Sequence, residues 1–170
     1  MATVSLLAGD SGGSGGGADG VGTSARFQSP RGVVASPSGG ALFVSDYSNH
    51  RLRHVSMSGD VTTFAGLLDV TGDQDGIGTS ASFDQPSGLA ISPDGTALYV
   101  ADLQNHLIRR VETSNASVTT IAGSSTAGDF ADGVADSVAR FDKPSSLVIS
   151  PEGMLFIADM GNYRVRDEEH

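Results

Sequence analysis

The chain has 170 residues, of which ten are basic and twenty acidic, so its formal net charge is −10. This charge argues against sequence-independent binding to nucleic acid, which requires a dense basic surface. The absence of Cys excludes disulfides, thiolate metal sites and a cysteine nucleophile. No apolar run is long enough to span a membrane, and residues 1–5 lack the basic start of a secretory signal. No membrane partner is expected, and the cellular location stays open.

Six short motifs recur three times in the same order along the chain. They are, in order, Ala-Gly, Asp-Gly, Phe-x-x-Pro, Ser-Pro-x-Gly, Asp-x-x-Asn and a single Arg. Ala-Gly begins at residues 8, 65 and 122, and the closing Arg stands at positions 53, 109 and 166. The recurrence predicts one domain built from three copies of a unit, at about residues 9–66, 66–123 and 123–170.

Each unit is predicted to contain four strands and no helix. In the first unit they cover about residues 32–36, 41–45, 51–56 and 60–65, and the other units contain their equivalents. Apolar and β-branched residues dominate these segments. Ser92-Pro93-Asp94-Gly95 is typical of a tight turn between two of them. Apolar residues with helical spacing are absent.

Repeated four-stranded units are typical of a β-propeller, in which each blade is one sheet. We label the strands of a blade a to d from the centre outward. The small, uncharged first strand suits the crowded centre, whereas Arg51, Arg53 and Arg109 on strand c suggest an outer position. The Phe of the third motif is expected to be buried in every unit and to anchor the long loop from strand d to strand a: Phe27, Phe83 and Phe141.

One stretch of the second unit resembles the NHL repeat. It reads Leu98-Tyr99-Val100-Ala101-Asp102 and, two residues later, Asn105-His106-Leu107-Ile108-Arg109. The other units carry the variants Asn49-His50-Arg51 and Asn162-Tyr163-Arg164, so the resemblance covers nearly the whole chain. It implies an all-β propeller, commonly with six blades and used mostly as a binding platform. RNA binding, known for some members with basic faces, does not suit this acidic chain.

The third unit stops before its fourth strand, while the N-terminus carries a spare one. Residues 3–8 contain Val4–Ala8, which matches Val61–Ala65 and Val118–Ala122. The strand order is therefore d-abcd-abcd-abc, which is three circularly shifted blades, or half of a six-bladed ring. Two completions stay open. Either a homodimer exchanges the spare strands, or the remaining blades belong to a longer chain.

Antiparallel strand order places the d-to-a loops and the b-to-c turns at the same end of every blade. We expect an acidic face there that binds a protein or peptide, because function favours loops on a rigid scaffold. A non-enzymatic interaction scaffold is therefore the first functional hypothesis. Its candidate residues are Asp46, Asn49, His50, Asp75, Asp102, Asn105, His106, Asp132, Asp159, Asn162 and Tyr163.

The Asp-x-x-Asn pairs offer oxygen ligands suited to Ca²⁺, but their presence in every unit favours a structural turn. Substitution of Asp102 or Asn105 by Ala is then expected to cost about 1–2 kcal/mol of stability. No catalytic residue, metal ligand or cofactor is predicted. The alternative hypothesis is a metal-assisted enzyme, of lyase or hydrolase type, with its site at the propeller centre. That site requires several converging His residues, whereas His50 and His106 lie in equivalent turns.

Overall fold

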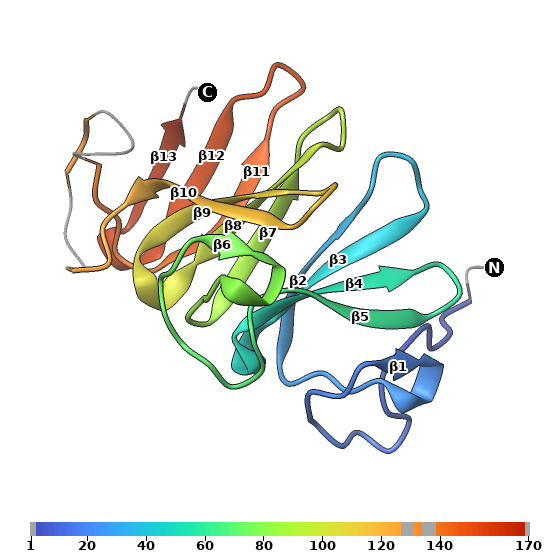
Figure 1. The fold of residues 1–170 in the computed structure, drawn as a ribbon. Coiled ribbons are helices and arrows are strands. Elements are labelled where there is room, and N and C mark those ends of the chain that lie inside the picture. The colour runs from blue at the N-terminus through green and yellow to red at the C-terminus, as the bar shows by residue number, and fades with distance from the viewer. Residues whose placement is uncertain (1–2, 127–130, 134–138, 169–170) are drawn as a thin grey trace.

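The computed structural model describes residues 3–126, 131–133 and 139–168 and consists of three antiparallel sheets (Figure 1). Sheet 1 has the spatial order β1-β5-β4-β3-β2, and sheet 2 has the matching order β6-β10-β9-β8-β7. Sheet 3 has the order β11-β12-β13. The all-β prediction is therefore confirmed.

The strands of sheets 1 and 2 occur at equivalent positions of the repeat. Those of sheet 1 are β1 (Gly20–Val21), β2 (Pro30–Ala35), β3 (Ala41–Asp46), β4 (Arg51–Ser56) and β5 (Asp60–Ala65). Those of sheet 2 are β6 (Gly76–Ile77), β7 (Pro86–Ile91), β8 (Ala97–Asp102), β9 (Leu107–Glu112) and β10 (Ser117–Gly123). Sheet 3 contains β11 (Pro144–Ile149), β12 (Leu155–Asp159) and β13 (Arg164–Glu168).

The helical segments of the described chain are single 3₁₀ turns, and none of them could cross a membrane. Two follow the short outer strands: η1 (Gly22–Ser24) and η3 (Gly78–Ser80). Three connect the second and third main strands of a sheet: η2 (Tyr47–Asn49), η4 (Leu103–Asn105) and η5 (Met160–Asn162). Each of these three ends on a residue with left-handed backbone: His50, His106 and Tyr163.

Sheets 1 and 2 differ from the four-stranded prediction by one short strand each. The long loop before β2 contributes β1, which pairs with the outer strand β5, and β6 pairs with β10 in the same way. Residues 3–8, predicted as a spare strand, form no strand in this single chain. Sheet 3 ends at β13 within the described residues, as the missing fourth strand of the third unit predicts.

The sheets lie side by side and fan out from their first strands, because β2 contacts β7 and β7 contacts β11 (Figure 1). The two chain termini lie at opposite ends of this array. One apolar cluster fills the junction of sheets 1 and 2, and another fills that of sheets 2 and 3. Phe83 and Phe141 are buried in these clusters as predicted, whereas Phe27 is only half-buried because no sheet covers its side of sheet 1.

Candidate interaction surfaces

A buried network of charged and amide groups stands at the end of the second main strand in each sheet. In sheet 2, Asp102 and Arg109 are fully buried, and Arg109 Nη1 donates a hydrogen bond to Asp102 Oδ2 over 2.8 Å. Asn105 Nδ2 donates to the same oxygen over 2.8 Å, and the backbone N–H of Asp84 donates to Oδ1. The carboxylate is thus satisfied inside the protein, as buried charge requires.

The same arginine fixes the long loop to the sheet. Its Nη2 donates to Asp75 Oδ1 over 2.8 Å and to the Gln74 carbonyl over 3.0 Å. Asp75 also accepts hydrogen bonds from the backbone N–H and the hydroxyl of Thr120 on β10. Arg109 therefore links strand c, the loop and, through Asp75, the outer strand in one connected group.

Sheets 1 and 3 repeat this network, which we call the arginine network. Arg53 bridges Asp46 and Asp19 at 2.7 and 2.6 Å, and Arg166 bridges Asp159 and Asp132 at 3.4 and 2.9 Å. Each guanidinium also lies over the ring of the anchoring Phe. The distances to the ring centres of Phe27, Phe83 and Phe141 are 5.0, 5.2 and 4.5 Å.

Strand c lies outside strands a and b of its sheet, as predicted, but its residues Arg51, Arg53 and Arg109 are buried by the loop that they bind. Several residues of the predicted acidic face are also buried inside the arginine networks and present no side chain to a partner. These residues are Asp46, Asn49, Asp102, Asn105 and Asp159.

His50 and His106 connect neighbouring sheets. His50 Nδ1 accepts a hydrogen bond from the backbone N–H of Gln85 over 3.2 Å. His106 Nδ1 accepts one from Lys143 over 3.1 Å. Each Nδ1 also lies within 3.3 Å of an Asp carboxylate oxygen of the next sheet. Tyr163 takes the third position and is 94% exposed.

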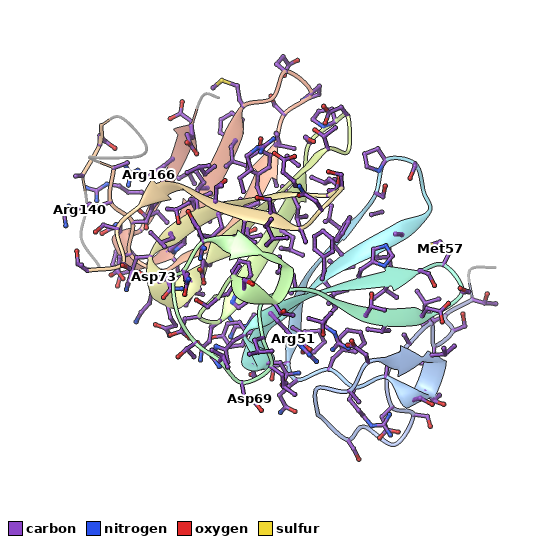
Figure 2. All side chains as sticks on the ribbon, in the orientation of Figure 1. Arg51, Met57, Asp69, Asp73, Arg140 and Arg166 are labelled. Carbon is purple, nitrogen blue, oxygen red and sulfur yellow. The ribbon has the colours of Figure 1, made fainter. Side chains whose placement is uncertain are left out.

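We call the end of the sheets that carries η2, η4, η5 and the long loops the loop face. In sheets 2 and 3 the arginine network contains two carboxylates for one bridging guanidinium, so one negative charge is left over, whereas in sheet 1 Arg51 also pairs with Asp46 and balances the second carboxylate. In sheets 2 and 3 that surplus reaches solvent at the exposed carboxylates of Asp75 and Asp132. Figure 2 shows Asp69 and Asp73 along the loop that joins β5 to β6, both exposed, away from Met57 at the tip of the β4–β5 hairpin.

Burial and hydrogen bonding shift two pKa values within these networks. Burial raises the pKa of Asp102 to about 6, and the contacts with Arg109 and Asn105 oppose the rise. Partial burial acts in the same direction on Asp19, but the Thr63 amide and Arg53 outweigh it and lower the pKa of that carboxyl.

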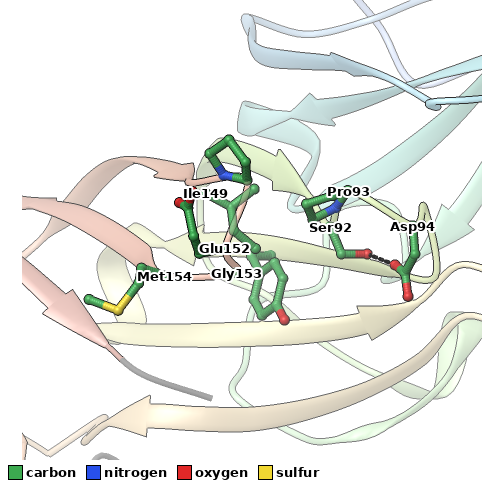
Figure 3. A pocket seen from close by; sticks show the side chains of 9 residues that line it. Ser92, Pro93, Asp94, Ile149, Glu152, Gly153 and Met154 are labelled. Atoms are coloured by element: carbon green, nitrogen blue, oxygen red, sulfur yellow. Dashed lines mark hydrogen bonds between the residues drawn. The ribbon is translucent and has the colours of Figure 1, made fainter.

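A hollow of about 470 Å³ lies at the opposite end of the sheets, between the β7–β8 and β11–β12 turns (Figure 3). Ser92, Tyr99, Ile149 and Met154 line it. Ser92 Oγ donates to Asp94 Oδ1 over 2.5 Å, and this bond together with those from Thr96 lowers the pKa of Asp94 to about 2. The hollow is open and formed by turns, and it brings no catalytic pair together.

The first strands β2, β7 and β11 enclose a smaller hollow of about 330 Å³ along the inner edge of the array. Its lining consists mainly of glycine, serine and aliphatic residues, with Arg31 at one end. In the described part of the chain, no three His, Asp or Glu side chains come close enough to hold a metal ion. The convergent His set required by the enzyme hypothesis is therefore not found among these residues.

Comparisons with known sequences identify relatives for most of the chain. The NHL repeat family model matches residues 27–55. NHL repeat-containing protein 2 of Homo sapiens is 37% identical over 104 residues, which are 61% of this chain and 14% of that protein. The protein of the same name from Bos taurus is 34% identical over 137 residues, which are 79% of this chain and 18% of that protein. This chain thus spans less than a fifth of either relative.

Solved structures share the arrangement of the sheets. An auxiliary nutrient binding protein from Bacteroides thetaiotaomicron superimposes with a TM-score of 0.73 at 25% identity, over 79% of this chain and 36% of that one. Its counterpart from Bacteroides ovatus gives a TM-score of 0.74 at 24% identity, over 88% of this chain and 40% of that one. These neighbours show that the fold is propeller-like.

Proposed function

Since the chain belongs to the NHL-repeat β-propeller family, we propose that it is a non-catalytic interaction module. Its loop face binds a basic protein or peptide. The observation that carries this proposal is the surplus carboxylate of the arginine networks, which is held rigidly at the surface in sheets 2 and 3. A fixed charge loses little conformational freedom on binding, so its electrostatic contribution is retained.

The charge distribution supports a basic partner in particular. Arg51, Arg53 and Arg109 of strand c are buried and already paired, so they do not offset the exposed acids at the surface, whereas Arg164 is exposed on the strand c of sheet 3. Asp69, Asp73 and Asp75 lie within one loop and are all exposed. Complementary charge steers the encounter and is weakened by salt. We therefore expect affinity for Lys- and Arg-rich peptides that falls as the ionic strength rises.

The test is a titration of a fluorescein-labelled Arg-rich peptide followed by fluorescence anisotropy. The double variant Asp69→Asn, Asp73→Asn removes two exposed charges from the loop face. At about 0.5 kcal/mol per charge, binding should weaken about fivefold at low salt. Asn keeps the shape of Asp and tolerates the left-handed backbone of residue 69, where φ is 58°.

Glu152→Gln is the matched control, because Glu152 is exposed in the β11–β12 turn at the opposite end of the sheets. The control should leave the affinity unchanged although it also removes one negative charge. If Glu152→Gln weakened peptide binding as much per removed charge as the double variant does, the binding would depend on the net charge of the protein alone. That result would refute the loop face as the site.

A further inference from the structure

Sheet 3 leaves one face uncovered, and the apolar residues on it correspond to residues that are buried elsewhere. Val148, Phe156 and Val165 are 61%, 37% and 79% exposed. The strand registers identify their equivalents in sheet 2, which pack against sheet 3: Ala90, Tyr99 and Ile108. The uncovered face of sheet 3 therefore has the pattern of one half of a sheet junction.

Sheet 1 leaves the complementary face uncovered. Val33 is 63% exposed there, and a hollow of about 210 Å³ on sheet 1 is lined by Leu42 and Val44 together with Leu7 and Ala8 of the N-terminal segment. The equivalents in sheet 2 belong to the cluster that packs against sheet 1: Leu89, Leu98 and Val100. The two ends of the array thus present the two different halves of the same repeated junction.

We propose that a second copy of this chain covers both faces, with sheet 3 of each copy packed on sheet 1 of the other. The junctions between sheets 1 and 2 and between sheets 2 and 3 already show this mode of packing. The termini lie at opposite ends of the array, so one chain cannot make the contact with itself (Figure 1). Two copies make it twice and form a closed six-bladed ring with twofold symmetry.

The N-terminal segment is the second part of the proposal. Gly9 N–H donates to the Gly22 carbonyl over 3.0 Å, just as Gly66 N–H donates to Gly78 over 3.1 Å after strand β5. Gly9 is therefore the structural equivalent of Gly66, and residues 4–8 occupy the position in the repeat that β5 occupies before Gly66. Leu6 and Val4 are exposed, and β13 has no outer neighbour among the described strands. Residues 4–8 of one copy are placed to pair with β13 of the other.

The receiving turn also keeps the geometry of the internal junctions. Ser29, Gln85 and Lys143 take the same left-handed backbone, with φ of 53°, 56° and 52°. Gln85 and Lys143 donate their backbone N–H to the His of the preceding sheet. In the proposed ring, Ser29 faces Tyr163 of the other copy, which buries that exposed ring.

One position makes the new junction looser than the internal ones. Gly32 and Gly88 come so close to the next sheet that an added Cβ would lie within 2.6 Å of its backbone. Ser146 holds the equivalent position in sheet 3. We therefore expect Ser146→Gly to strengthen the association of the two copies.

Size-exclusion chromatography with light scattering measures the assembly directly. We expect a particle of twice 17.3 kDa at micromolar concentration. Val148→Lys with Val165→Lys should give a folded monomer, because both residues are exposed in the single chain. Val70→Lys, an exposed apolar residue on the loop face, is the control and should stay dimeric. A folded monomer of the unaltered chain would refute the proposal and assign both faces to sheets outside these residues. An open polymer of many copies would refute the closed ring of two copies.

A disulfide test locates the exchanged strand. The registers Thr62↔His54 and Thr119↔Arg110 place Ser5 of one copy opposite Asp167 of the other. The chain has no native Cys, so Ser5→Cys with Asp167→Cys should form a covalent dimer on mild oxidation. Each single variant should stay non-covalent. Failure of the double variant to cross-link in a proven dimer would refute the strand exchange. The binding function proposed above would be unaffected by either outcome.

Discussion

Among single residues, Asp46, Asp102 and Asp159 are buried within the arginine networks, whereas Asp69 and Asp73 are exposed in the loop joining β5 to β6. Asp102→Asn should destabilise the chain by about 3–5 kcal/mol, because it removes the fully buried charge partner of the buried Arg109 guanidinium and leaves only the half-exposed Asp75 to pair with it. This exceeds the turn-based expectation of about 1–2 kcal/mol, since the sequence did not reveal that Arg109 is buried. Urea unfolding measures the change.

Asn105→Ala removes one amide from the same network and should cost about 1–2 kcal/mol. This milder variant allows the free energy of unfolding to be measured even if the Asp102 variant does not fold. Asp73→Asn, in the exposed loop, should change the free energy of unfolding by less than about 0.5 kcal/mol. A loss below about 1 kcal/mol for Asp102→Asn would contradict the network as a structural element.

Glu168 provides a pH-dependent test. Burial raises its pKa from 4.5 to about 7, so the folded chain favours the neutral carboxyl. The contribution of the neutral Glu168 carboxyl to the free energy of unfolding is fully present below about pH 4.5 and is lost as the pH rises through 7. Glu168→Gln should therefore raise the melting temperature more at pH 8 than at pH 5. A difference in melting temperature between the two proteins that does not change with pH would contradict the raised pKa of Glu168.

At the scale of elements, hydrophobic pattern and turn motifs predicted β2 to β5 to within about two residues. The short strands β1 and β6 could not be predicted, because two residues carry no alternation and their pairing comes from β5 and β10. The Asp-x-x-Asn motif marked the turns, but it gave no indication that the left-handed residue is the one that follows the motif: His50, His106 and Tyr163.

The closeness of the sheets gives a prediction for a single glycine. A Cβ at Gly88 would lie 2.6 Å from Ser146 Cα and 3.0 Å from the Ser145 carbonyl oxygen. Gly88→Ala should therefore cost about 1–3 kcal/mol, because the sheets must separate. At Gly40 the nearest atom lies 3.7 Å away, so Gly40→Ala should change stability by less than about 0.5 kcal/mol. Equal effects in thermal unfolding would contradict the tight junction.

At the scale of the whole molecule, the repeat predicted the fold class but did not predict the pairing of the loop aspartates with the strand c arginines. Asp75 and Arg109 are far apart in the sequence, and a turn motif gives no hint that they pair. Their common threefold recurrence was the available signal, since Asp19, Asp75 and Asp132 recur in phase with Arg53, Arg109 and Arg166. The location of the surplus charge required the three-dimensional structure, because it depends on which arginines the loops bury.

Hydrogen–deuterium exchange of the chain with and without the Arg-rich peptide locates the surface on which the peptide binds. A binding site on the loop face predicts slower exchange in the loop joining β5 to β6, where the exposed acids lie. It predicts no change in the β7–β8 and β11–β12 turns around the hollow at the opposite end. Protection of those turns, with the loop face unchanged, would contradict the account.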